Sequence, residues 1–149
     1  MTFKHIVVAT DFSDCSARAL DFGIELAAQF DAQLTLVHAW EIPSTGYSAA
    51  LYSPGDLLTP IEQAAATQLN AALESLRERL PRAKSVLRAG VAWEEIVAAA
   101  ADVQADLIVV GTHGRRGVSR ALLGSVAERV VRLSPVPVLT VRGTEGVTA

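Results

Sequence analysis

Apolar residues along the chain follow two patterns: short unbroken runs, and longer stretches in which they recur every three or four positions. The runs 5–10 (HIVVAT) and 107–110 (LIVV) have no polar face, and 33–40 (QLTLVHAW) is rich in apolar and β-branched residues. Such runs are typical of strands buried on both faces of a parallel sheet. The more polar run 84–89 indicates an edge strand, and 137–142 predicts a last strand.

Four stretches with helical spacing lie between these runs. Ser13 or Asp14 can cap the first helix. The second is predicted to cover 59–80, because it starts with Thr-Pro-Ile-Glu. That sequence combines a Thr cap, a proline at the first helical position and a Glu three residues after the cap. Apolar spacing around 96–103 predicts the third helix, and the fourth is predicted to cover 122–133.

Strands that alternate with helices predict an α/β fold with a doubly wound, five-stranded parallel sheet of the Rossmann-like or flavodoxin-like kind. The reason is that each parallel pair needs a right-handed helical crossover. We find no internal repeat, so residues 1–149 are expected to form a single domain with a frayed tail from 143. The segment 41–58 contains two prolines and two glycines and predicts a long connection.

Composition argues against several classes of protein. Half of the residues are hydrophobic, but no apolar run approaches the roughly 20 residues that a membrane-spanning helix needs. No secretory signal precedes the first strand, and Cys15 is the single cysteine, so we expect a cytoplasmic protein. The formal charge of −3 argues against a nucleic-acid partner. Cys15 is expected to pack in the core, and His5 and His38 are expected to be structural because neither has a second metal-ligating side chain at suitable spacing.

Residues suited to binding a ligand follow two of the predicted strands. In doubly wound sheets, ligands bind beyond the carboxyl ends of the strands, where the winding reverses. Thr10 and Asp11 follow the first strand, and Gly111-Thr112-His113-Gly114 follows the fourth. After nine intervening residues, Gly124-Ser125 stands at or near a helix start. Glycines let backbone N–H groups approach an anion closely, and a helix N-terminus favours negative charge, so the pattern predicts a phosphate site.

An alternative explanation of these glycines is purely structural. Gly111, Gly114 and Gly117 could simply make turns, and Gly124 could permit close packing of a helix against the sheet. The joint pattern of two glycines after a central strand, a spacer containing Arg115, Arg116 and Arg120, and Gly-Ser at a helix start favours phosphate binding. The three arginines are expected to assist as flexible groups.

Other nucleotide-binding and signalling classes fit less well. A dinucleotide-binding dehydrogenase would carry G-x-G-x-x-G directly after the first strand, where this chain has Thr10-Asp11-Phe12-Ser13. The P-loop sequence Gly-Lys-Ser or Gly-Lys-Thr occurs nowhere. A receiver domain would need an acidic residue at the end of the third strand, where Arg88, Ala89 and Gly90 stand.

Longer stretches resemble the universal stress protein family. The resemblance lies in 106–115 (DLIVVGTHGR), 122–128 (LLGSVAE), 135–139 (PVPVL) and the opening segment 4–13, so it covers nearly the whole chain. Its specific part is the G-x2-G-x9-G-S spacing that begins at Gly111, which in the family marks members that bind ATP. The resemblance therefore implies an adenine-nucleotide site that holds ATP, with Mg²⁺ as the expected companion ion.

The resemblance also assigns roles to individual residues. The glycines and the serine would hold the phosphates, Asp11 would lie near the nucleoside and Ala39 would border the adenine. As an alternative, Asp11 could only cap the next helix, and His113 could be an exposed loop residue. The full set of expected nucleotide-binding residues is Ala9, Thr10, Asp11, Ala39, Val110, Gly111, His113, Gly114, Gly124, Ser125, Val126 and Ala127.

Function is expected to be regulatory, with ATP or a related adenine nucleotide biasing a conformational or assembly equilibrium. Two alternatives stay open: a slow ATPase or phosphotransferase using Asp11 or His113, and a dimeric stress scaffold without nucleotide. The last strand, 136–142, is apolar enough to be a liability at an exposed edge. Universal stress proteins form dimers through the last strand, and the resemblance to them therefore implies a homodimer.

Overall fold

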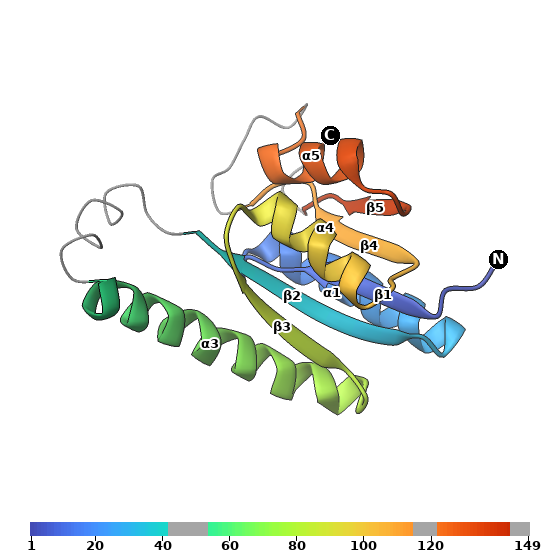
Figure 1. Cartoon of the computed structure of the whole chain (residues 1–149). Coiled ribbons are helices and arrows are strands. Elements are labelled where there is room, and N and C mark those ends of the chain that lie inside the picture. The colour runs from blue at the N-terminus through green and yellow to red at the C-terminus, as the bar shows by residue number, and fades with distance from the viewer. Residues whose placement is uncertain (42–53, 115–121, 144–149) are drawn as a thin grey trace.

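Five parallel strands form one sheet in the order β3-β2-β1-β4-β5 (Figure 1). The structure, a computed structural model, describes residues 1–41, 54–114 and 122–143. The predicted α/β fold and its parallel sheet are confirmed. The elements are β1 (His5–Ala9), α1 (Asp14–Phe30), β2 (Gln33–Trp40), α3 (Pro54–Arg79), β3 (Lys84–Ala89), α4 (Ala92–Asp102), β4 (Leu107–Gly111), α5 (Ser125–Leu133) and β5 (Val138–Val141).

Helices cover both faces of this sheet, α1 and α3 on one and α4 and α5 on the other (Figure 1). Side chains alternate along a strand, so Ile6 and Val8 of β1 pack in the layer beneath α1 and α3. Val7 and Ala9 pack in the layer beneath α4 and α5. Because both faces of β1 are buried, its sequence shows no polar alternation. No helix in the described ranges is long and apolar enough to cross a membrane.

Strand order places the winding reversal between β1 and β4. The chain passes from β1 outward to β2 and β3, then returns to lay β4 on the other side of β1. In register, Ile6 of β1 lies opposite Leu107 of β4, and Val8 lies opposite Val109. The carboxyl ends of two strands about a hundred residues apart in sequence therefore lie side by side. The third predicted strand, β3, lies at a sheet edge as expected.

Most predicted boundaries hold within a residue, but two helix starts are wrong. The second predicted helix was expected to begin at Thr59, whereas α3 begins at Pro54 and contains Pro60. A proline fits the first helical position because its missing N–H has no helical partner there, and Pro54 already provides that start. The predicted connection 41–58 therefore ends earlier, and residues 42–53 lie outside the described part.

The fourth predicted helix was expected to begin at Leu122, whereas α5 begins at Ser125. The reason is a contact made by Gly124, whose N–H donates to the Thr112 carbonyl across 2.6 Å. Gly124 is therefore extended (φ −62°, ψ 157°) and acts as the N-cap of α5. Leu122 and Leu123 lie outside the helix and are 61% and 40% exposed.

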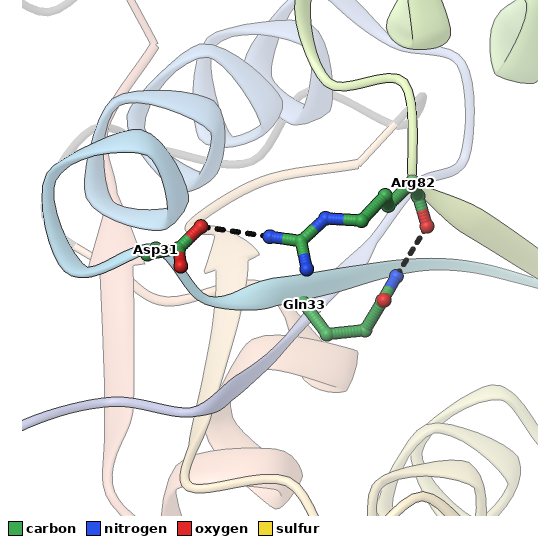
Figure 2. A network of polar contacts seen from close by, with 3 residues as sticks. All are labelled: Asp31, Gln33 and Arg82. Carbon is green, nitrogen blue, oxygen red and sulfur yellow. Dashed lines mark hydrogen bonds and ion pairs between the residues drawn. The ribbon is translucent and has the colours of Figure 1, made fainter.

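Polar side chains form hydrogen bonds at the amino ends of the strands, which we call the amino edge of the sheet; the opposite ends form its carboxyl edge (Figure 2). Arg82, before β3, donates to the Asp31 carboxylate at the end of α1 across 2.7 Å. Gln33, which begins β2, donates its side-chain amide to the Arg82 carbonyl across 2.6 Å. Asp106, just before β4, accepts the backbone N–H groups of Lys4 and His5 at 2.5 and 2.9 Å. These contacts tie loops from distant parts of the chain to the strand starts.

Candidate functional site

The ends of β1 and β4 bring Asp11 against the glycine loop. A Cβ atom built on Gly114 would lie 2.6 Å from Asp11 Oδ2, which is closer than atoms in contact can approach. Only a glycine therefore fits at 114 while Asp11 keeps this position. The two segments that sequence reasoning selected, one after each strand, do meet at the winding reversal.

Asp11 is fixed by the turn that leads into α1. Its Oδ1 accepts the Ser13 N–H across 3.0 Å. The N-cap of α1 is Ser13, whose side chain accepts from the Ser16 N–H. Ser13, one of the two predicted caps, is thus confirmed, and the alternative in which Asp11 itself caps the helix is not what the structure shows. The Asp11 carboxylate instead accepts a hydrogen bond within the turn and lies beside Gly114.

Gly111 has a packing role that sequence reasoning missed. A Cβ at this position would meet Cys15 Sγ at 2.9 Å and the Cys15 backbone carbon and oxygen at 3.1 and 3.2 Å. The first turn of α1 therefore lies directly against the end of β4. The structural explanation of these glycines, which sequence analysis attached to Gly124 and a helix, applies here to Gly111 and α1.

Thr112 connects the glycine loop to its neighbours. Its N–H donates to the Val141 carbonyl of β5 across 2.9 Å, and its own carbonyl accepts from Gly124. A Cβ on Gly124 would lie 3.0 Å from that carbonyl oxygen, so a larger residue would force the two segments apart. Thr112 is 5% exposed. The hydrogen bond from the Gly124 N–H to the Thr112 carbonyl therefore joins the loop after β4 to the start of α5.

The start of α5 has the helix N-terminus on which the predicted phosphate site depends. Gly124 offers no side-chain hydrogen bond to cap the helix. The first-turn N–H groups of an α-helix have no acceptor within the helix, and the helix dipole adds partial positive charge there. Ser125 and Val126 are exposed in this first turn, whereas the Ala127 side chain is buried. Their backbone N–H groups form a donor set suited to phosphate oxygens.

His113 lies inside the loop and is half-buried. Its Nδ1 lies 3.1 Å from the Thr112 hydroxyl. Its Nε2 is buried and has no hydrogen-bond partner within 1–41, 54–114 and 122–143. A buried polar atom without a partner is costly, so Nε2 is a candidate ligand contact.

The remaining predicted nucleotide-binding residues fall into two groups, those with buried side chains and those with half-buried ones. Ala9 and Val110 have buried side chains in the core between the sheet and α4 and α5, so only their backbone could face a ligand. Thr10 and Ala39 are half-buried near the ends of β1 and β2. The Thr10 hydroxyl accepts the Phe12 N–H across 3.0 Å, so it stabilises the turn. Arg115, Arg116, Gly117 and Arg120 lie outside the described residues.

Two histidines expected to be structural make structural contacts. His5 Nε2 lies 2.7 Å from the Thr35 hydroxyl, and burial lowers the pKa of His5 from its ordinary value of 6.5. His38 Nδ1 lies 2.8 Å from the Thr10 carbonyl oxygen. Among the described residues, no group of three or more His, Cys, Asp or Glu side chains could hold a metal ion.

The chain also matches known proteins in sequence. The model of the universal stress protein family matches residues 2–142. A universal stress protein of Methanocaldococcus jannaschii is 36% identical over 143 residues, covering 94% of this chain and 82% of that protein.

Two solved structures share the fold. One is a universal stress protein in complex with cAMP, with a TM-score of 0.72 and 27% identity, covering 97% of this chain and 100% of that one. The other is the universal stress protein from Archaeoglobus fulgidus in complex with dAMP, with a TM-score of 0.66 and 28% identity, covering 95% of this chain and 99% of that one.

Proposed function

The chain belongs to the universal stress protein family, and from this premise we propose that it binds ATP at the carboxyl edge of its sheet. The observation that carries the proposal is the position of Asp11, whose Oδ2 lies 2.6 Å from where a Cβ of Gly114 would be. A carboxylate suited to ribose hydroxyls and a glycine loop suited to phosphate thereby share one site. The start of α5 supplies further N–H donors beside them.

The adenine class of ligand is supported by the two similar proteins solved with cAMP and with dAMP. Both ligands combine an adenine base with one phosphate group. ATP extends this chemistry by two phosphates, which the donors of Gly114, Ser125 and Val126 would hold. The half-buried Ala39 would leave room for a flat base beside β2.

Mg²⁺ is proposed to arrive with the nucleotide. The described residues contain no cluster of metal-ligating side chains, and Asp11 is the carboxylate at the loop. Mg²⁺ commonly keeps several waters and is held by substrate phosphates and one or two carboxylates. The ion would neutralise phosphate charge and leave the chain's own residues to position the nucleotide.

Binding is proposed to act as a regulatory signal. Catalysis of phosphoryl transfer needs a group that positions the attacking water, and among the residues that the structure describes at the site we nominate only Asp11 and His113. A ligand biases an equilibrium by binding one state more tightly than another.

Assembly is a suitable equilibrium, because β5 lies at a sheet edge and Val131 and Leu133 of α5 are 45% and 50% exposed. We propose a homodimer through 136–142, and sedimentation as a monomer at micromolar concentration would contradict it.

Calorimetric titration with ATP and Mg²⁺ tests the nucleotide site. The wild type should bind saturably, and Gly114→Ala should bind at least about tenfold more weakly, because its Cβ displaces Asp11. Gly124→Ala should also weaken binding, because it pushes the α5 start away from Thr112. Gly143→Ala is the matched control, since its Cβ makes ordinary contacts of 3.7 Å. Absence of heat from the wild type, with no copurified nucleotide, would overturn the proposal.

A further inference from the structure

Phe12 has an unusual backbone conformation beside the proposed site. Its φ is 64°, in the left-handed region that bulky side chains rarely adopt. The other non-glycine residues with positive φ in the described ranges are Asp31 and Gln104, which follow helices α1 and α4, where this conformation is common. Phe12 instead precedes a helix. Something other than helix termination must therefore hold it.

Contacts with β2 and Thr10 hold Phe12 in this conformation. Its N–H donates to Thr10 Oγ1 across 3.0 Å. Its ring packs against the His38 imidazole, with centroids 4.5 Å apart and planes tilted by 52°. His38 is fixed in turn, because its Nδ1 lies 2.8 Å from the Thr10 carbonyl, which can only accept, so Nδ1 carries the proton. The three residues form a closed set of contacts around the turn.

This turn determines where Asp11 points. Asp11 lies between Thr10 and Phe12, and its carboxylate reaches Ser13 on one side and the Gly114 position on the other. If Phe12 relaxed to negative φ, the backbone after Asp11 would change direction and its carboxylate would leave the glycine loop. We propose that Phe12, held by the His38 ring, is a positioning residue that sets Asp11 for the nucleotide. The inference rests on the proposed function.

Phe12→Leu tests the role of the ring, with Phe30→Leu as the matched control. Phe12 and Phe30 both pack against the same core layer, and Phe30 has its own aromatic partner, Phe3, at 5.2 Å. Both substitutions should lower thermal stability. Phe12→Leu alone should weaken ATP binding, by about tenfold. Wild-type affinity in a folded Phe12→Leu protein would overturn the inference.

A double-mutant cycle separates positioning from a general structural role. If Phe12 acts through Asp11, then adding Phe12→Leu to Asp11→Ala should cause no further loss of affinity. Additive losses would contradict the inference. Phe12→Gly, which accepts φ 64° without strain but has no ring, should also bind weakly. Should Phe12→Leu not fold, this variant and His38→Asn, which keeps a donor near Thr10 but lacks the ring, give the same test.

A measurement without nucleotide makes failure of the inference distinguishable from failure of the proposed function. The NMR signal of the Asp11 carboxyl carbon in the free protein should shift in Phe12→Leu and stay in place in Phe30→Leu. An unmoved Asp11 signal would overturn the positioning role even if ATP binds. If the wild type binds no ATP but the Asp11 signal still shifts in Phe12→Leu, the proposed function is overturned and the positioning role stands.

Discussion

The two edges of the sheet pair their polar groups in different ways. At the amino edge, Asp106 accepts two backbone N–H groups and Gln33 donates to the Arg82 carbonyl, so loop groups are satisfied within the chain. At the carboxyl edge, α5 begins without a side-chain cap, and His113 Nε2 has no partner in the described part of the chain. Polar groups that are hydrogen-bonded within the chain stabilise the fold, whereas polar groups without such a partner are available to a ligand. Substitutions at the two edges should therefore have different consequences.

Gly111→Ala should be an exception to this difference, because Gly111 is at the carboxyl edge but its close packing against Cys15 stabilises the fold. We expect a loss of about 2 kcal/mol in the free energy of unfolding, since the new Cβ meets Cys15 Sγ at 2.9 Å and the Cys15 backbone at 3.1 Å. Urea denaturation measures this loss. Gly143→Ala, which would touch the same Cys15 at 3.7 Å, should stay near wild type. Equal stability of the two variants would contradict the packing role.

Asp106→Ala should show that the amino edge contributes to stability and not to nucleotide binding. It removes the acceptor of the Lys4 and His5 N–H groups, and we expect a loss of about 1 kcal/mol after allowing for solvent screening. Asp106→Asn retains an acceptor and should lose less. Denaturation and ATP titration should show reduced stability with unchanged affinity. A change in affinity would mean that the two edges are coupled.

Acid should weaken the amino edge in two steps. Burial lowers the pKa of His5, so the fold favours its neutral form. The contribution of His5 to the free energy of unfolding is therefore full above the ordinary pKa of 6.5 and is lost as pH falls below that value. Hydrogen bonds from Lys4 and His5 lower the pKa of Asp106, whose contribution is lost as pH falls below the ordinary value of 3.8. Melting temperature should fall less in His5→Gln than in wild type between about pH 7 and pH 5. Parallel curves would argue against the first step.

Arg82→Ala should have the smallest effect. Its ion pair with Asp31 is exposed, with side chains 72% and 89% accessible, so we expect less than about 0.5 kcal/mol. Gln33→Ala should cost more, because it removes the half-buried amide that donates to the Arg82 backbone. Thermal melts of both variants make the comparison. A larger loss of stability for Arg82→Ala would show that the ion pair stabilises this edge more than the hydrogen bond to the Arg82 backbone does.

Much of this protein could be predicted from local sequence patterns. Strand and helix types follow from apolar spacing, because 5–10 and 107–110 must be buried on both faces and 33–40 matches β2 in full. The two wrong helix starts have one cause in common. A start signal such as Thr59-Pro60 is local, and whether it is used depends on a competing start at Pro54 or, for α5, on the contact between Gly124 and Thr112.

Local sequence was enough to predict the α/β alternation, the resemblance to universal stress proteins and the two segments of the proposed site. Three contacts could be seen only in the folded chain: Asp11 lies beside Gly114, Gly111 packs against the start of α1, and the Phe12 ring lies against His38. Periodicity reports on neighbours within a few residues. Contacts across β1, β2 and β4 depend instead on strand order and register, which are fixed only when both faces of the sheet are buried together.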